Sequence, residues 1–353
     1  SYYSEVNNLT TEGTETSQRK ISYSVFSVEN FVNSVFNHMT KPTLNDYFHL
    51  HFLVLIWGFT AVLGLLVDLP APTLVVYRTL LAALGLWVVL RFRSGESIWG
   101  IPTADRWRLL ATGGLIALHW IAFFGAARIA NASVCLAGMA TGSLWTSLLE
   151  PIAFRRRVQS LEVALGVVVI AGLYLIFRFE FDRAAGLLLA VFSAMLSAVF
   201  TIINSRYAPR YGALTITFYE MVGAFGGSLL FLAVYLTLQT QPMPLVPAAG
   251  DWLWIGILAF VCTVYAYSAS VQLMRKFSAF AVNLTVNLEP VYGIVLAWLV
   301  FGDRERMTPG FYAGTLVILV AVLAYPFLNH RLEKTKKGSV TQPHEPGVSG
   351  HGL

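Results

Sequence analysis

Five ionisable side chains lie inside long apolar segments of the sequence, and these are the residues whose chemistry matters most. They are Arg78, His119, Glu150, Glu220 and Glu289. A charged or polar group in the core of a bilayer is costly, so such residues are rare there and mark functional sites by default. We therefore consider binding and proton exchange for each of them beside a structural role.

Glu289 is the leading candidate because it lies near the middle of the apolar segment 278–301. A carboxylate at that depth can exchange a proton or bind an ammonium group. Pro290 follows it, and a proline removes a backbone donor and clashes with the preceding turn. Free carbonyls near the midplane would then be available to a ligand. The alternative is a structural kink in which Glu289 pairs with a neighbouring helix.

Arg78 and Glu220 occupy equivalent positions in two aligned stretches, 71–78 and 213–220. The planar guanidinium matches a carboxylate, so we predict that Arg78 binds a substrate carboxylate or forms an outer gate. Glu220 is its predicted counterpart in the inner half of the membrane. The two segments enter from opposite sides, which disfavours a direct salt bridge, although a buried pair remains the alternative.

Four further residues are candidates for substrate binding or coupling: His119, Trp120, Tyr267 and Asn283. His119 is either a proton carrier or a hydrogen-bonded packing residue, and Trp120 follows it directly. Trp120 and Tyr267 are deep aromatic residues that suit an amphipathic organic solute. Asn283 and Asn287 are one helical turn apart and share a face. Helical spacing places that face away from Glu289, so the two asparagines predict a second polar stripe.

The segments that must position these residues are long enough to cross a membrane. Hydrophobic residues make up 56% of the 353 residues, charged residues only 12%, and mean hydropathy is +0.64. A soluble domain carries about 25% charged residues, and a helix needs roughly 20 apolar residues to span a bilayer. Alternation at period two is absent, which argues against an outer-membrane barrel. We predict an all-α protein with ten spans at about 50–67, 72–90, 108–127, 131–154, 160–177, 184–204, 213–238, 252–273, 278–301 and 310–329.

The basic residues are distributed as in a membrane protein, so the net positive charge gives no reason to expect a nucleic-acid partner. The net charge is +5 and the pI about 9.2, but most Lys and Arg residues fall in alternate loops. This bias predicts that both termini are cytoplasmic, in a multi-pass protein of a bacterial inner (plasma) membrane. Residues 1–42 are polar and predict a disordered leader, with His38-Met39 either a cloning junction or an internal start. Residues 330–353 predict a disordered tail.

The aligned stretches 71–78 and 213–220 belong to a longer internal repeat. Five spans separate them, and an odd number turns the second copy upside down in the membrane. Beyond these stretches the register holds with small shifts. At an offset of 147 residues, which we call the repeat offset, three further pairs align: Arg128 with Arg275, Trp107 with Trp254, and Trp120 with Tyr267. The pattern predicts two inverted five-helix repeats, 50–178 and 184–329. Inverted repeats build two alternative openings around one site in secondary transporters. The alternative is that any two sets of apolar helices align somewhere.

The chain resembles the EamA-type family of the drug/metabolite transporter superfamily. The resemblance covers roughly 50–329, and the residues that carry it are Trp57-Gly58-Phe59, Leu288-Glu289-Pro290, the loop 301–305, and Gly310 with Gly314. Gly302-Asp303 stands where the family has a Gly-Glu pair, and the corresponding first-half loop, Arg155-Arg156-Arg157, departs further. The resemblance implies ten helices around a central cavity and transport of small metabolites, often amino acids, with export as our first expectation. Protons are the expected coupling ion.

Several function classes lack their motifs. The sequence contains no phosphate-binding loop, no Gly-rich dinucleotide fingerprint and no His/Cys metal pattern. We therefore expect no cofactor, no metal and no enzymatic activity, with a small molecule and the lipid bilayer as partners. An intramembrane enzyme acting on lipid is the alternative, but the candidate polar residues lie toward the midplane rather than at one interface. A channel or a non-transporting sensor is the other alternative. The sequence does not indicate an oligomeric state.

Overall fold

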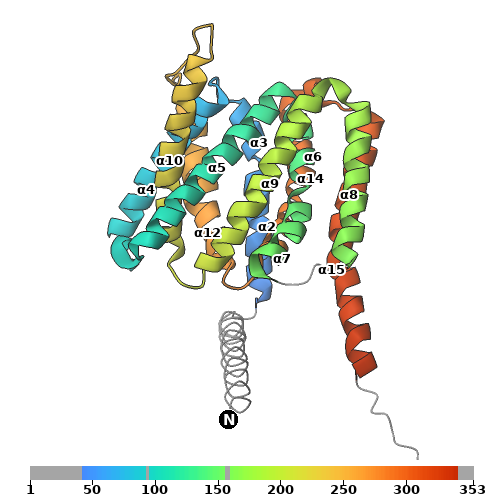
Figure 1. Ribbon diagram of the computed structural model, residues 1–353. Helices are drawn as coiled ribbons and strands as arrows, with labels where there is room; N and C mark the ends of the chain where they lie inside the picture. The colour runs from blue at the N-terminus through green and yellow to red at the C-terminus, as the bar shows by residue number, and fades with distance from the viewer. Residues whose placement is uncertain (1–41, 93–94, 156–159, 341–353) are drawn as a thin grey trace, which may run out of the picture.

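The computed structural model describes residues 42–92, 95–155 and 160–340, and nearly all of them form helices (Figure 1). The predicted leader lies almost entirely outside these residues, as do Arg156 and Arg157. The last helix continues to Val340, past the predicted end of its span at 329. In chain order the helices are α2 (Leu44–Gly58), α3 (Thr60–Leu65), α4 (Ala71–Phe92), α5 (Thr103–Ile129), α6 (Ala132–Met139), α7 (Gly142–Phe154), α8 (Ser160–Phe179), α9 (Ala184–Tyr207), α10 (Ala213–Thr237), α11 (Asp251–Gly256), α12 (Ala266–Leu273), α13 (Ala279–Val286), α14 (Glu289–Phe301) and α15 (Pro309–Val340). Short turns η1 (Ile98–Gly100), η2 (Phe181–Arg183) and η4 (Gly302–Glu305) and the π-helix η3 (Ile257–Tyr265) complete them.

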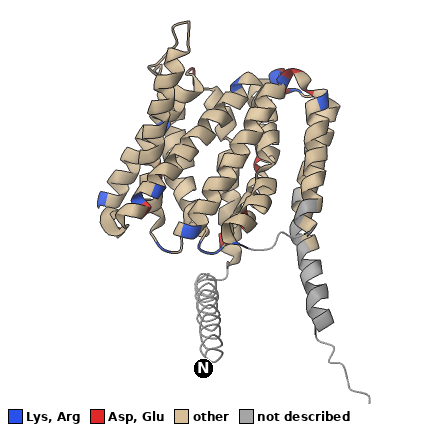
Figure 2. Ribbon diagram, in the orientation of Figure 1, with Lys and Arg blue, Asp and Glu red and all other residues tan. Residues whose placement is uncertain are grey.

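The helices make a multi-pass membrane protein. Within the described residues, eight helical stretches are long and apolar enough to cross a membrane. Two shorter apolar helices, Ala164–Phe179 and Pro309–Ala321, coincide with the predicted fifth and tenth spans. Charged side chains gather at the two ends of the bundle, and the middle is almost free of them (Figure 2). The prediction of an all-α membrane protein is confirmed.

The first half of the chain, up to α8, packs directly against the second half. Helix α5 lies against α9 and α10, α4 lies against α10, and α8 runs beside α15 at one edge (Figure 1). Small residues permit the closest of these approaches. A Cβ on Gly113 of α5 would meet the backbone of Glu220, and a Cβ on Gly223 of α10 would meet the backbone of Leu110. Helices in lipid associate through such small residues because packing replaces the hydrophobic effect.

Two of the predicted spans are broken in the same way. The fourth divides into α6 and α7 at Ala140-Thr141, and the ninth into α13 and α14 at Asn287-Leu288. The backbone N–H of Ala140 donates to Leu136 and that of Thr141 to Gly138; Asn287 donates to Asn283 and Leu288 to Thr285. These four bonds match at the offset of the internal repeat. The predicted interruption near Pro290 is therefore present, but it lies just before Glu289, which becomes the first residue of α14.

The eighth span is irregular in a different way. Its middle is the π-helix η3, which links α11 to α12. The Thr263 hydroxyl donates to the Leu258 carbonyl at 2.8 Å, while the Cys262 carbonyl accepts a bond from the Trp57 indole at 3.1 Å. A π-helix shifts backbone groups out of the α-helical ladder and is frequent at functional sites. Here the shifted groups are bound by neighbouring side chains.

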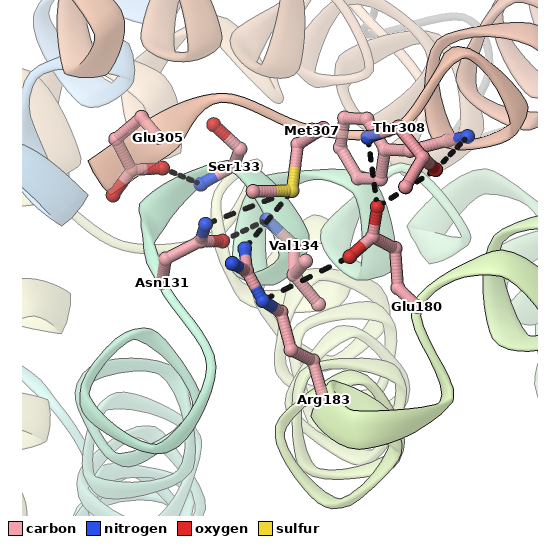
Figure 3. A network of polar contacts seen from close by, with 9 residues as sticks. Asn131, Ser133, Val134, Glu180, Arg183, Glu305, Met307 and Thr308 are labelled. Carbon is pink, nitrogen blue, oxygen red and sulfur yellow. Dashed lines mark hydrogen bonds and ion pairs between the residues drawn. The ribbon is translucent and has the colours of Figure 1, made fainter. Parts of the chain in front are cut away.

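One end of the bundle is held by a polar network between the halves, which we call the Glu305 end (Figure 3). Buried Glu305 accepts bonds from the backbone N–H groups of Ala132 and Ser133, at 3.1 and 2.9 Å. Glu180 accepts bonds from the backbone and hydroxyl of Thr308, at 3.0 and 2.9 Å. Both carboxylates thereby satisfy donors at helix N-termini, where negative charge is stabilising. The network ties the starts of α6 and α15 to the opposite half.

At the opposite end of the bundle, the Arg275 end, an arginine binds backbone carbonyls of its own half. Arg275 donates to the carbonyls of Ala208 and Tyr211, each at 2.8 Å. Arg128 does the same at the Glu305 end, where it donates to the carbonyl of Gly64 at 2.8 Å. Donor and acceptor of the Arg128–Gly64 bond match those of the Arg275–Tyr211 bond at the offset of the internal repeat. Lys276 adds an ion pair with Asp46 at 2.7 Å between the halves.

Substituting Gly223 by alanine will destabilise the protein, because the added methyl group must displace the backbone of α5. Overpacking of this kind costs about 1–3 kcal/mol. Gly226→Ala is the matched control on the same helix, since its Cβ would meet nothing within 4 Å. Thermal unfolding in detergent, followed by tryptophan fluorescence, measures both variants. Equal unfolding temperatures for the two would contradict the close approach of α5 and α10.

Glu305→Ala will also destabilise the fold, because it removes both acceptors at the start of α6. Hydrogen bonds to charged groups contribute about 1.5–3 kcal/mol. Asp303→Ala, at an exposed position two residues earlier, should change the free energy of unfolding by less than about 0.5 kcal/mol. If Asp303→Ala were the more damaging of the two, Glu305 would not be the residue that ties the halves together.

Candidate functional site

A cavity of about 80 Å³ lies among the broken helices, and most of the predicted site residues line it. That volume holds only a handful of water molecules, at about 10–15 Å³ each. The lining comes from both halves of the chain: Trp57, Thr60, Arg78, His119, Trp120, Phe123, Met139, Ser197, Phe200, Thr201, Cys262, Tyr267, Ser270, Met274, Val282, Asn283, Val286 and Glu289. Its walls are mainly apolar and aromatic, with a few polar groups, as in sites for small organic molecules.

Arg78 is positioned by α4 and held from two sides. Its Nε donates to the Thr263 hydroxyl at 3.0 Å, and its guanidinium carbon lies 3.8 Å from the centroid of the Trp120 ring. A cation over an indole face is stabilised by about 2 kcal/mol or more when water is excluded. Among the ion pairs between described residues, none involves Arg78. No carboxylate of a described residue therefore forms an ion pair with the Arg78 guanidinium.

Glu289 lies at the first position of α14 and lines the same cavity as Arg78. It is 6% exposed, and no hydrogen bond or ion pair to another described residue satisfies its carboxylate. The helix N-terminus favours a negative charge at this position. One side chain of each charge thus meets the cavity, and the two are not paired with each other. What they bind stays a prediction.

Glu220 does not line the cavity but lies behind Tyr267. The Tyr267 hydroxyl donates to Glu220 Oε2 at 3.1 Å, and the Asn204 amide approaches the same oxygen at 3.4 Å. Glu220 Oε1 and Asn204 Oδ1 are buried without a partner. The Tyr267 ring meets the Trp120 ring at 6.4 Å between centroids, nearly at right angles. Arg78 and Glu220 therefore contact two aromatic residues that touch each other, and the two charges form no direct salt bridge within the described residues.

His119 and Asn283 are both anchored at the cavity wall. His119 Nδ1 lies 2.9 Å from the Ser193 carbonyl and 2.8 Å from its hydroxyl. The Asn283 amide donates to the Thr146 hydroxyl at 2.6 Å. Our prediction that Asn283 lies on a different face from Glu289 is wrong, since both line the cavity. The break before Glu289 resets the helical phase, so spacing along one continuous helix does not apply.

Sequence reasoning missed the small polar residues that hold the candidates in place. Ser193 orients His119, Thr263 binds Arg78, and Asn204 binds both Tyr267 and Glu220. Serine and threonine hydroxyls in helices often bond to the backbone of their own helix. The residue type therefore does not indicate which of them binds a site residue. Asn204 is the exception, because an amide inside an apolar span is costly in the same way as a charge.

Tyr267→Phe will destabilise the protein, because Glu220 then keeps only the long contact with Asn204. Leaving a buried acceptor without a donor costs about 1–3 kcal/mol. Tyr265→Phe, which removes an exposed bond to His49, is the control and should cost less than about 0.5 kcal/mol. In a double-mutant cycle with Glu220→Gln, we expect a coupling energy of about 1 kcal/mol or more. Additive effects would mean that Tyr267 and Glu220 do not interact.

Comparison with known proteins identifies the second half of this bundle. Residues 184–325 match the model of the EamA-like transporter family. A search of curated proteins finds no match. Among solved structures 24 chains match, and one, described only as a crystal structure of a protein, has a TM-score of 0.59 at 17% sequence identity. That alignment covers 81% of this chain and 99% of the other, and at such identity it shows a shared fold alone. Residues 184–325 are therefore identified as an EamA-like transporter domain, and the resemblance inferred from the sequence is confirmed over that part of the chain.

Proposed function

We propose that this protein is a secondary transporter that moves a small zwitterion, an amino acid or a close relative, across the membrane. The observation that carries the proposal is the pair of opposite, unpaired charges at one cavity, Arg78 and Glu289. A guanidinium fork matches a carboxylate, and a carboxylate attracts an ammonium group. A zwitterion supplies a counter-charge to both side chains at once, whereas a solute of a single charge leaves one of them without a counter-charge.

Alternating access by two inverted five-helix repeats is the mechanism we propose. Four structural matches at the repeat offset support it. The backbone bonds at the two helix breaks correspond, and so do the bonds made by Arg128 and Arg275. The helix caps of Asn131 and Ser278 correspond as well, each accepting from the residue three positions later. Finally, the aligned residues Trp120 and Tyr267 touch each other at the cavity.

Broken helices suit this mechanism. Met139, at the end of α6, and Glu289, at the start of α14, both line the cavity. In many transporters, interrupted helices at the repeat interface supply the groups that bind substrate and coupling ion. Rocking of the halves would open the Glu305 end and the Arg275 end in turn. We propose that the Arg275 end faces the cytoplasm, because the basic loops alternate toward it, and that transport is export.

Protons are the coupling ion that we propose. Glu289 can exchange its proton for a substrate ammonium, so that loading and unloading of the cavity are linked to proton movement. Because no basic side chain of a described residue pairs with the Glu289 carboxylate, this exchange breaks no ion pair between described residues.

The proposal is tested by flux of labelled amino acids and related metabolites in proteoliposomes, with and without an imposed pH gradient. We expect gradient-driven accumulation of at least one zwitterion, lost in Glu289→Gln. Arg78→Gln should weaken the apparent affinity at least tenfold, because a charge-assisted bidentate bond is lost. Arg304→Gln, at an exposed position of the Glu305 end, should behave like the wild type.

The outcomes separate the parts of the proposal. If flux is the same with and without the pH gradient, and the same in Glu289→Gln as in the wild type, proton coupling through Glu289 is refuted but transport is not. Equal affinity in Arg78→Gln and wild type removes the carboxylate-binding role. Transport of a cation or an anion, but of no zwitterion, overturns the substrate class.

A further inference from the structure

The bonds between His119 and Ser193 determine which ring nitrogen of His119 carries a proton. Nδ1 lies 2.9 Å from the Ser193 carbonyl oxygen, which can only accept. Nδ1 must therefore be the donor. The Ser193 hydroxyl, 2.8 Å from Nδ1, donates its own proton to the His119 carbonyl at 2.9 Å, so it too accepts from Nδ1. All three bonds agree on one tautomer, with the hydrogen on Nδ1.

This arrangement leaves Nε2 free at the cavity. The ring lies near Phe123 and Phe200, with centroids 6.2 and 5.3 Å away, and His119 lines the cavity. Both hydrogen bonds of the ring to described residues use Nδ1, and Nε2 is not among the fully buried polar atoms that lack a partner. In the neutral ring, Nε2 carries a lone pair and can only accept a hydrogen bond.

The surroundings favour the neutral ring. Arg78 already brings a positive charge to the same cavity, and the bonds of the His119 ring go to a carbonyl and a hydroxyl rather than to a carboxylate. A second cation in a membrane core is costly unless it is paired. Glu289, the one carboxylate among the lining residues, is needed for the ammonium group in the proposed function.

We propose that His119 is a specificity-determining residue, which selects zwitterions whose side chain carries a hydrogen-bond donor, such as a hydroxyl or an N–H group. This inference rests on the proposed function and names the substrate class more closely. In a cavity of about 80 Å³ a bound substrate leaves little room for water. An apolar side chain would leave Nε2 without a donor, and a site built to bond a hydroxyl discriminates against an analogue that lacks it.

The test uses isosteric pairs in which a methyl group replaces the hydroxyl: threonine against valine, and serine against 2-aminobutyrate. The full chain is reconstituted in proteoliposomes, and flux and competition are measured for each compound. In the wild type we expect each hydroxyl compound to have an apparent affinity about tenfold or more above that of its apolar partner. If no zwitterion moves or competes, these four and the wider amino-acid panel included, the zwitterion carrier itself is refuted. Equal affinities within both pairs would overturn the role of His119 and leave the carrier standing.

Two substitutions separate selection from structure. In His119→Asn, the amide nitrogen replaces Nδ1 and keeps the bond to Ser193, while the acceptor at the Nε2 position is lost. In His119→Gln, the longer amide reaches the Nε2 position and gives up the Ser193 bond. We expect His119→Asn to keep the wild-type unfolding temperature and to lose the preference for the hydroxyl compound of each pair. We expect His119→Gln to keep that preference and to unfold at a lower temperature. Ser205→Ala, on the same helix as Ser193 and away from the cavity, is the control. A full preference in His119→Asn would overturn the proposal.

The tautomer can be observed without any substrate. In protein labelled with ¹⁵N-histidine, one of the 7 histidines should show a protonated Nδ1 and a bare Nε2. That signal should disappear in His119→Asn. A protonated Nε2 on His119, with a bare Nδ1, would contradict the acceptor role whatever the flux measurements give.

Discussion

The core of a bilayer offers no water to a polar group, and the arrangement of this protein follows from that constraint. Charged residues concentrate at the ends of the bundle, where Glu305 and Glu180 satisfy helix N-termini and Arg128 and Arg275 satisfy carbonyls. In the middle, few charges are tolerated. Arg78 is held by an indole face and a hydroxyl instead of a counter-ion, and Glu289 by the start of a helix.

The same constraint explains why interrupted helices surround the cavity. Regular helices satisfy their own backbone and present only side chains to a solute. The breaks before Gly142 and Glu289, and the π-helix at Thr263, bring backbone groups and helix ends to the cavity region. Such irregular backbone is tolerated at this depth only where protein or a solute covers it. The irregular segments and the candidate binding residues therefore occur together.

Contact between the halves makes the cavity sensitive to their relative position. Trp120 and Tyr267 come from opposite halves, and each also holds a charged residue of its own half, Arg78 and Glu220. His119 and Ser193 also bridge the halves. The Trp120–Tyr267 and His119–Ser193 contacts would change together if the halves moved relative to each other. The glycines of α5 and α10 allow that interface to be close without bulky side chains that would lock it.

The sequence by itself determined the membrane class, the helical spans and the main candidates, because apolar length and the cost of buried charge are local properties. Arg78, His119 and Glu289 were identified on that ground, Trp120 and Tyr267 were identified as deep aromatic residues, and all five line one cavity. Only the tertiary structure decided which of them lie together. It placed Glu220 behind Tyr267, brought Asn283 to the side of Glu289 through a helix break, and selected Ser193 and Thr263 from many similar hydroxyls. These outcomes depend on the rotation and register of packed helices, which are set by contacts between distant segments and leave no periodic signal in the chain.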